Sequence, residues 1–350
     1  MKRVLVVNVN WMGDVIFSSP IFTALKTAYP QVKISCLAVP RVKAVLESIP
    51  GIDEIIVYDE HGAHRNPFAK LRLIHELSQK HFDTAFLLHR SLTRALFVFL
   101  AGIPQRVGYD AKGRGAFLTR KVKTVDEPTI HRADYYLNVL ESFGVVVPSR
   151  TSFLTVSSDS EREIRDTLKE HEVAESDFLI VVHPAGNWDL KRWPAQYFFL
   201  LIEELLKDGK TKVVISGSRD DVALAAEIAA GSHGKPVILV GKLDLKQLMA
   251  LMKRADCVVS ADSGPLHIAS SVGTDVIGIF GPTRPEITGP RGSGRSVILQ
   301  RDVGCNRRPC YNLGCPDNTC MQAVSVKEVL DAIRQIQSQK NTGHFPKQHR

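Results

Sequence analysis

The chain has 350 residues, of which 44% are hydrophobic and 23% are charged, and its formal net charge at neutral pH is +8. This length and composition exclude a disordered chain and a single small domain, and they predict two globular cores.

In the first half of the chain, short apolar runs alternate with segments of helical periodicity. The predicted strands are RVLVVNV, KISCLAV, EIIVY and TAFLL, and helices are predicted near 15–28, 41–48 and 66–80. Asn8, Asn10 and Asp14 interrupt the apolar start and no small-residue cleavage site follows it, so it reads as a strand and not as a signal peptide.

A strongly basic stretch follows at residues 61–123, where 12 Lys and Arg residues stand against 3 Asp and Glu residues. It is either a solvated face or a surface that meets a polyanion. Without interleaved aromatic residues, single-stranded nucleic acid is disfavoured. The best apolar run, ALFVFLAGI, is too short to span a bilayer. We therefore expect a cytoplasmic protein that could touch the inner face of the cytoplasmic membrane peripherally.

The segment 147–160, rich in Ser and Thr, predicts a domain boundary, and the alternation then resumes. The strands are FLIVVH, KVVISG, PVILV, DCVVS and DVIGIFG, with helices near 194–208, 219–230, 245–253 and 265–272. Apolar strands between helices indicate parallel sheets covered on both faces. The prediction is an α/β protein with Rossmann-like domains at 1–155 and 156–324, a helix at 325–338 and a disordered tail at 339–350.

The cysteines divide into two groups. Cys36 and Cys257 lie in predicted strands and are expected to be inert core residues. The other four are evenly spaced at Cys305, Cys310, Cys315 and Cys320. Even spacing is a poor match to the paired cysteines of zinc sites, so a compact loop of thiols is favoured over a metal site.

In the second half, SADSGPLHIA follows the predicted strand DCVVS. In open α/β sheets, ligands bind beyond the carboxyl ends of the strands. Ser263 and Gly264 would open a helix whose free N–H groups suit a phosphate, with Asp262 and His267 beside them. A capped helix with a packed histidine is an equally good interpretation of this motif alone.

The segment HPAGNWDLKRWP follows the strand FLIVV. Its small turn at Gly186 and Asn187 precedes Lys191 and Arg192, and free N–H groups beside a lysine form an anion site. The alternative is a solvated basic loop. In ISGSRDDVA, Asp221 either accepts a ribose hydroxyl or caps a helix, and capping is favoured.

Several motifs of other enzyme classes are absent from the sequence. There is no P-loop, no G-x-G-x-x-G at the first turn, and no Asp-x-Asp pair to hold a metal on a diphosphate. The sequence therefore supports neither a P-loop ATPase nor a dehydrogenase, and it favours a site without metal or other cofactor.

Taken together and in this order, these motifs resemble the heptosyltransferases of glycosyltransferase family 9. The resemblance includes Gly13 and Asp14 after the first strand, HPAGNWDLKRWP, ADSGPLHIAS, GIFGPT and the four-cysteine segment. It implies a GT-B fold with an interdomain cleft. Trp11 and the cysteine segment favour the type that adds the second heptose of the lipopolysaccharide inner core.

The resemblance also implies substrates and residue roles. The donor is ADP-L-glycero-D-manno-heptose, held by the second domain, and the acceptor is an anionic, lipid-linked inner-core sugar, held by the first. Asp14 matches the general base of the family, although Asp at such a turn often only caps a helix. The residues matched to the donor site are Lys191, Asp262, Ser263, Gly264 and His267, with Asn187, Gly186, Arg192 and Asp221 as further candidates.

Two other functions stay open from the sequence. One is a GT-B transferase that uses a different nucleotide sugar, because these motifs bind a diphosphate and say little about base or sugar. The other is a non-catalytic protein that binds nucleotide sugars or polyanions through its basic first half.

Overall fold

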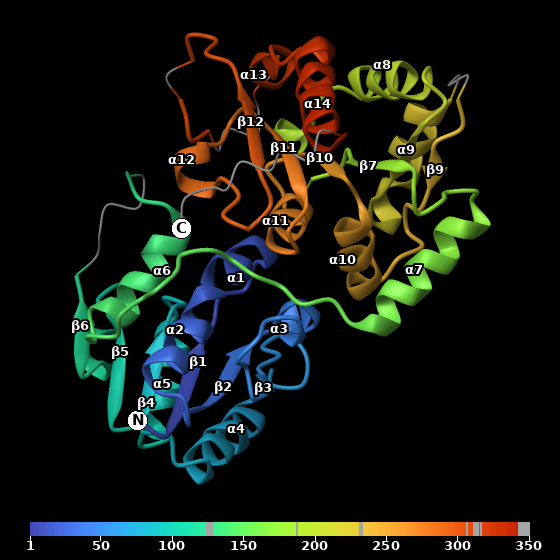
Figure 1. Cartoon of the computed structure of the whole chain (residues 1–350). Helices are drawn as coiled ribbons and strands as arrows, with labels where there is room; N and C mark the ends of the chain where they lie inside the picture. Colours follow the sequence, from blue (N-terminus) through green and yellow to red (C-terminus); the bar gives the residue numbers. More distant parts are fainter. Residues whose placement is uncertain are drawn as a thin grey trace. The chain divides into compact units, whose positions relative to one another are not determined.

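The computed structural model describes residues 1–123, 129–186, 188–230, 234–305, 307–310, 315 and 317–341. The chain folds into two compact units, Met1–Thr155 and a second unit that begins at Val156. Each unit has its own parallel sheet with helices packed against it (Figure 1). This confirms the predicted α/β class with two Rossmann-like sheets.

The first unit has a six-stranded sheet in the order β3-β2-β1-β4-β5-β6, with all neighbours parallel. Its strands are β1 (Arg3–Val7), β2 (Lys33–Ala38), β3 (Glu54–Val57), β4 (Thr84–Leu87), β5 (Gln105–Tyr109) and β6 (Arg120–Val122). Its helices are α1 (Met12–Ser18), α2 (Pro20–Ala28), α3 (Lys43–Glu47), α4 (Pro67–Gln79), α5 (Leu92–Leu100) and α6 (Arg132–Glu141), with the 3-10 turns η1 (Pro40–Val42) and η2 (Arg114–Phe117).

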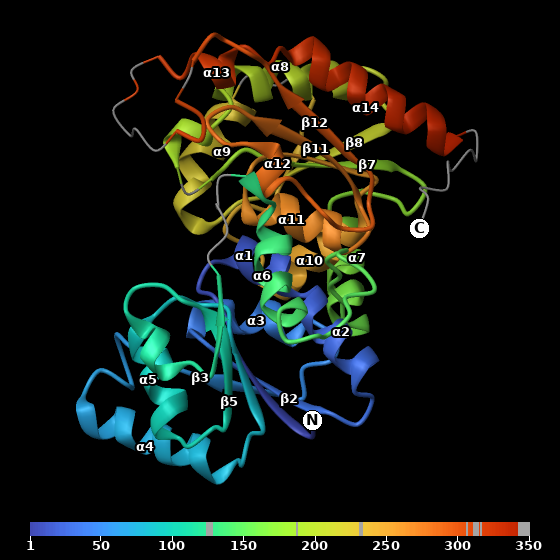
Figure 2. The same cartoon turned by 90° about the vertical axis from the view of Figure 1, so that its left-hand side faces the viewer.

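Alternate strand residues of this sheet face opposite layers of helices. Leu5 and Leu87 belong to a buried cluster that also holds Leu73 and Leu77 of α4 and residues of α5. The ring of Phe86, which points to the other face, packs against Phe143 just after α6, with centroids 5.5 Å apart. Figure 2 shows α4 and α5 side by side on the first of these faces.

The second unit repeats this design with the order β12-β11-β10-β7-β8-β9, again all parallel. Its strands are β7 (Phe178–His183), β8 (Thr211–Ile215), β9 (Val237–Ile238), β10 (Cys257–Ala261), β11 (Asp275–Phe280) and β12 (Ser296–Gln300). Its helices are α7 (Ser158–Glu170), α8 (Ala195–Leu206), α9 (Val222–Ala229), α10 (Leu245–Arg254), α11 (Gly264–Ser271), α12 (Pro285–Thr288), α13 (Thr319–Gln322) and α14 (Val326–Asn341), with the 3-10 turns η4 (Asp189–Lys191) and η5 (Arg219–Asp221).

The last helix begins at the predicted capping box. The Ser325 N–H donates to Glu328 Oε2 at 2.7 Å, and the Glu328 N–H donates back to Ser325 Oγ at 3.3 Å. Val329, Ile333 and Ile336 are buried in the core against α8 and the sheet. The helix runs to Asn341, so residues 339–341 are helical and not part of a disordered tail, while 342–350 lie outside the described residues.

Some elements differ from the prediction. The helix expected at 15–28 is two helices, because Pro20 has no N–H to continue α1 and instead opens α2. The strands β5, β6 and β12 and the helices α5, α6 and α7 were not predicted. Two of these strands, β6 and β12, lie at sheet edges and carry exposed or half-buried residues, so they lack the continuous apolar run of a central strand.

Candidate functional site

Both sheets have a point where the strand order reverses. In the first it lies between β1 and β4, and in the second between β7 and β10. Such switch points leave a crevice at the carboxyl ends of the strands, where ligands of α/β proteins bind. The chain reaches Asp14 just after β1, Lys191 shortly after β7 and Asp262 directly after β10.

In the first unit, Asp14 is the third residue of α1 and follows Gly13. The N-cap of α1 is Trp11, so Asp14 does not occupy the capping position that was the alternative role for it. Its Oδ1 accepts a hydrogen bond of 2.7 Å from the Tyr136 hydroxyl of α6. Burial and the charge of Asp14 raise the pKa of Tyr136 well above its usual value, so Tyr136 stays protonated and keeps donating.

The loop between β1 and α1 is fixed by two arginines. Arg94 of α5, whose side chain is buried, donates to the Asn8 carbonyl at 3.2 Å and to Asn10 Oδ1 at 2.9 Å. Arg41 donates to the Asn10 carbonyl at 2.8 Å, and its guanidinium lies 4.1 Å from the Trp11 ring centroid. The backbone before Asp14 is therefore held in place from both sides.

A second group of polar residues lies at the carboxyl ends of β4 and β5. Arg114 is fully buried and donates to the carbonyls of Tyr109 and His89. Burial, together with the charges of Arg94 and Arg114, lowers the pKa of His89 to about 3, so this histidine is neutral. Arg94 and Arg114 are thus internal, which removes them from the surface charge of the basic stretch.

In the second unit, Asp262 is the centre of a buried polar network. Its Oδ2 accepts from Lys191 Nζ at 2.8 Å and from Thr288 Oγ1 at 3.2 Å. Its Oδ1 lies 3.4 Å from His267 Nε2, and Lys191 Nζ also donates to the Asp262 carbonyl at 3.1 Å. The structure therefore brings together three of the residues that the sequence had placed in the donor site.

The ionisation of Asp262 is fixed by these neighbours. Burial alone would raise the pKa of this carboxyl, since only 4% of Asp262 is exposed. The hydrogen bond from His267 and the charge of Lys191 outweigh burial and hold the pKa far below its usual range. Asp262 is thus a permanent anion that orients an ammonium group and an imidazole.

The helix α11 begins beside this network. Ser263 is its N-cap residue, but the hydroxyl pairs with Ser260 Oγ at 2.9 Å and makes no capping bond to the helix. Gly264 and Pro265 form the first turn, and His267 is buried one turn into the helix. Without a side-chain cap, the first N–H groups of α11 remain suited to an anionic ligand.

Lys191 and Arg192 differ sharply although they are adjacent. Lys191 belongs to the Asp262 network, and its ammonium lies 5.2 Å from the Trp188 ring centroid. Arg192 is exposed and pairs with Asp189 at 3.0 Å. Trp193 is a core residue, with its indole N–H bound to the Val324 carbonyl.

The remaining candidates from the sequence, Gly186, Asn187 and Asp221, differ in their surroundings. Gly186 follows β7 and lies beside open space, because a Cβ there would meet no atom within 4 Å. Asn187 lies outside the described residues. Asp221 accepts from the Ser218 N–H at 2.8 Å in a capping box, which is the role favoured for it.

Sequence reasoning missed two partners of these carboxylates. Tyr136 is 122 positions from Asp14 along the chain, and Thr288 is 26 positions from Asp262. Neither residue lies in a recognisable motif, although Thr288 follows GIFGPT closely. Contacts of this kind depend on the packing of α6 and α12, which no local pattern specifies.

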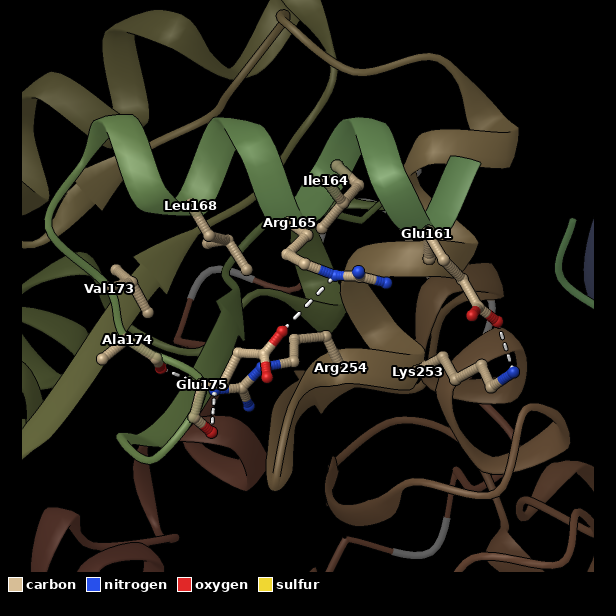
Figure 3. Close-up of a pocket in the computed structure, with 10 residues that line it drawn as sticks. Glu161, Ile164, Arg165, Leu168, Val173, Ala174, Glu175, Lys253 and Arg254 are labelled. Atoms are coloured by element: carbon tan, nitrogen blue, oxygen red, sulfur yellow. Dashed lines mark hydrogen bonds and ion pairs between the residues drawn. The ribbon is translucent and has the colours of Figure 1, made fainter. Parts of the chain in front are cut away.

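A pocket of about 370 Å³ lies away from these residues, between α7 and α10 of the second unit (Figure 3). Its lining combines the apolar residues Ile164, Leu168 and Val173 with charged residues, of which Arg254 donates to the Ala174 carbonyl at 2.9 Å. None of the predicted site residues lines it. We therefore do not place the functional site in this pocket.

The cysteines are all free thiols. Burial raises the pKa of Cys36 to about 12 and raises that of Cys257 further, so both are unreactive core residues as predicted. Within the described part of the chain, no group of three or more His, Cys, Asp or Glu side chains is arranged to hold a metal ion.

Comparisons with known proteins identify the family of the chain. The profile of glycosyltransferase family 9 (heptosyltransferase) matches residues 70–316, more than half of the chain. The chain belongs to glycosyltransferase family 9. This confirms the resemblance seen in its motifs and supports a glycosyltransferase over the non-catalytic alternative.

Individual members of family 9 align along most of the chain. Lipopolysaccharide heptosyltransferase 2 of Escherichia coli K12 is 27% identical over 308 residues, covering 85% of this chain and 87% of that protein. A family 9 glycosyltransferase structure from Veillonella parvula is 25% identical with a TM-score of 0.87, covering 96% of this chain and 97% of that one. The structure of E. coli ADP-heptose lipopolysaccharide heptosyltransferase II is 22% identical with a TM-score of 0.80, and the match covers 97% of this chain and 100% of that one. This similarity of fold confirms the predicted GT-B class.

Proposed function

We propose that this family 9 enzyme transfers L-glycero-D-manno-heptose from ADP-heptose to the inner core of lipopolysaccharide, with inversion at the anomeric carbon. The observation that carries the proposal is the Lys191–Asp262–His267 network beside the uncapped start of α11, in a chain that belongs to family 9. Relatives named as heptosyltransferases and as ADP-heptose enzymes support the choice of donor.

In this reaction Asp14 accepts the proton of the acceptor hydroxyl as its oxygen attacks the anomeric carbon of heptose. The bond between that carbon and the diphosphate oxygen breaks, and ADP leaves with the electron pair. Lys191 and the first N–H groups of α11 stabilise the negative charge that develops on the diphosphate.

Asp262 has a positioning role in this scheme. It keeps Lys191 and His267 oriented before the donor arrives, so little reorganisation is needed when the diphosphate binds. Tyr136 has the corresponding role for Asp14, since its hydroxyl fixes the carboxylate on α1. We assign donor binding to the second unit and acceptor binding to the first.

The proposed acceptor is anionic and lipid-linked, carrying Kdo and a first heptose, so that the enzyme adds the second heptose. A lipid-linked acceptor requires the enzyme to work at a membrane surface, and we propose the cytoplasmic face of the inner membrane. Among the described residues no helix is long and apolar enough to cross a bilayer.

The test is a substrate screen with product analysis. Purified enzyme is incubated with ADP-heptose, UDP-glucose or GDP-mannose, and with Kdo-lipid A acceptors that carry or lack the first heptose. We expect turnover with ADP-heptose and the heptosylated acceptor, and an inverted anomeric configuration by NMR. Turnover of another nucleotide sugar in preference to ADP-heptose would refute the proposed donor, and preference for the acceptor without heptose would refute the proposed acceptor.

A further inference from the structure

The outer face of α4 and α5 in the first unit exposes large apolar side chains. Phe68 and Leu71 of α4 are 83% and 58% exposed, and Leu92, Phe99 and Leu100 of α5 are 46%, 43% and 52% exposed. These five residues, here called the α4–α5 surface, are half of the ten large hydrophobic side chains found exposed among the described residues. The two helices pack against each other on one face of the sheet (Figure 2).

The helix α5 is apolar on its outer side as well as its inner side. Ala95 and Val98 are buried in the core, while Leu92, Phe99 and Leu100 face outward. This helix contains the first six residues of the run ALFVFLAGI, which no part of the proposed mechanism uses. Apart from Thr93, the exposed residues of α5 are apolar. Such a face is normally buried in protein or in lipid, and a helix of nine residues is too short to span a bilayer.

The charge on and beside these two helices is mainly positive, and the one acidic residue of α4 and α5 is the exposed Glu76. From residue 84 to residue 109 the sequence contains no Asp or Glu. Arg65, just before α4, and Arg72, within it, are exposed. The guanidinium of Arg106 lies 5.3 Å from the Phe99 ring centroid. Exposed Phe and Leu flanked by arginine form the pattern of surfaces that lie in the headgroup region of an anionic bilayer.

We propose that the α4–α5 surface docks on an anionic lipid bilayer, with Phe68, Leu71 and Leu100 inserted at the interface and the flanking arginines at the headgroups. The purpose of this contact rests on the proposed lipid-linked acceptor, but the surface itself is argued from exposure and charge alone. Apolar insertion and attraction to anionic headgroups add together, so binding requires both.

A second copy of the chain is a weaker match to this surface. A symmetric dimer places the same patch on both partners, so the basic residues of one copy would face those of the other. Juxtaposed like charges oppose such a contact, whereas an anionic bilayer is attractive over the whole basic area. We therefore assign the α4–α5 surface to an anionic bilayer and not to a second copy of the chain.

The test is flotation of the full chain with vesicles of phosphatidylcholine, alone or mixed with phosphatidylglycerol, without donor or acceptor. We expect binding only with phosphatidylglycerol, weakened by salt. The combined variant Phe68→Ser, Leu71→Ser and Leu100→Ser should lower the vesicle partition coefficient at least about tenfold. Arg65→Gln with Arg72→Gln should weaken binding and flatten its salt dependence.

The matched control removes three exposed apolar residues elsewhere, as Val146→Ser, Leu200→Ser and Val222→Ser, which are 78%, 41% and 53% exposed. It should bind vesicles like the native protein, and all variants should keep the native melting temperature and ADP affinity. Native vesicle binding by the α4–α5 variant overturns the proposal, as does a native dimer that this variant turns into a monomer. Vesicle binding that follows the expected pattern in a protein without heptose transfer leaves the surface standing and refutes the proposed function instead.

Discussion

At the scale of single residues, the two proposed roles depend on side chains whose positions are fixed by neighbours. Asp14 is held by the Tyr136 hydroxyl, and Lys191 is held by Asp262 and by the ring of Trp188. A group that is already oriented loses little entropy when substrate binds. Substitutions at these positions should therefore separate catalysis from binding.

Replacing Asp14 with Asn should abolish most turnover and leave ADP binding intact. Loss of a general base typically lowers the rate about a hundredfold to ten-thousandfold. Asn keeps the size of the side chain and a carbonyl oxygen that accepts from Tyr136, so the packing of α1 against α6 is preserved. Steady-state kinetics and ADP calorimetry on Asp14→Asn and Asp14→Ala would measure this, and near-native turnover in both would count against the assignment.

Replacing Lys191 with Ala should weaken ADP binding about tenfold to a hundredfold, because a charge-assisted hydrogen bond to phosphate contributes roughly 1.5–3 kcal/mol. The adjacent variant Arg192→Ala is the matched control and should change ADP affinity little, since Arg192 pairs with Asp189 at the surface. Calorimetry with ADP decides between them.

The folding stability of Lys191→Ala must be measured as well, because an unfolded variant would also lose ADP binding. Asp262 loses its ammonium partner in this variant and keeps Thr288 and His267, so the loss stays below the about 3–5 kcal/mol that a fully unpaired buried charge costs. The titration must therefore be made at a temperature where the variant is folded. Equal ADP affinity for the native protein and folded Lys191→Ala would remove lysine from the donor site.

At the scale of elements, the strand ends carry buried histidines as well as site residues. His183 closes β7 and contacts Ser216 Oγ at 3.0 Å, and burial lowers the pKa of His183 to about 4. The unfolded chain has a histidine pKa of about 6.5. Because the unfolded state binds the proton more tightly, this histidine supports the fold fully above about pH 6.5 and less as the pH falls.

Lowering the pH from 6.5 to 5 should therefore lower the free energy of unfolding by about 1.5 kcal/mol through His183, because the slope rises from about half to nearly all of 1.4 kcal/mol per pH unit over this range. The variant His183→Gln has no titrating group at this position and should lose correspondingly less stability over the same range. Urea denaturation of both proteins at several pH values measures the difference. Identical slopes of stability against pH would show that His183 is not buried neutral.

At the scale of the whole molecule, charge divides the two units. The surplus in residues 61–123 belongs to the first unit, which we assign to the anionic acceptor. The exposed basic residues act on encounter, because salt screens such charges over roughly 8–10 Å. Arg94 and Arg114, both buried, contribute to the fold instead.

Neutralising Lys112, Arg120 and Lys121 together to Gln should raise the acceptor KM several-fold, roughly three- to tenfold, and flatten its salt dependence. All three are exposed. ADP affinity should stay unchanged. The matched control is Arg162, Lys169 and Lys327 to Gln, three exposed basic residues of the second unit. If both triple variants have the native acceptor KM, the basic stretch is a solvated face only.

Activity should survive chelation. The sequence has no Asp-x-Asp pair to hold a metal on the diphosphate, and Lys191 with the start of α11 supplies positive charge at the proposed site instead. Transfer assays with and without EDTA, each also with added magnesium, test this. A loss of activity that magnesium or manganese restores would contradict it.

The sequence by itself determined the α/β class, the paired sheets, the family and most central strands, because continuous β-branched runs are a local signal. It also placed Lys191, Asp262 and His267 at strand ends. It missed the edge strands β6 and β12, which lack a continuous apolar run, and the inner strand β5, whose sequence QRVGY is short and begins with two polar residues. It also merged α1 with α2, which Pro20 separates.

Only the tertiary structure decided which of these residues meet. The strand order puts the switch points at β1 and β4 and at β7 and β10, and it joins Asp14 to Tyr136 and Asp262 to Thr288. It also buried Arg94 and Arg114, which look like surface charge in the sequence. The physical reason is that periodicity records which face of an element is apolar, whereas the partner of a polar atom is chosen by packing between elements distant in the chain.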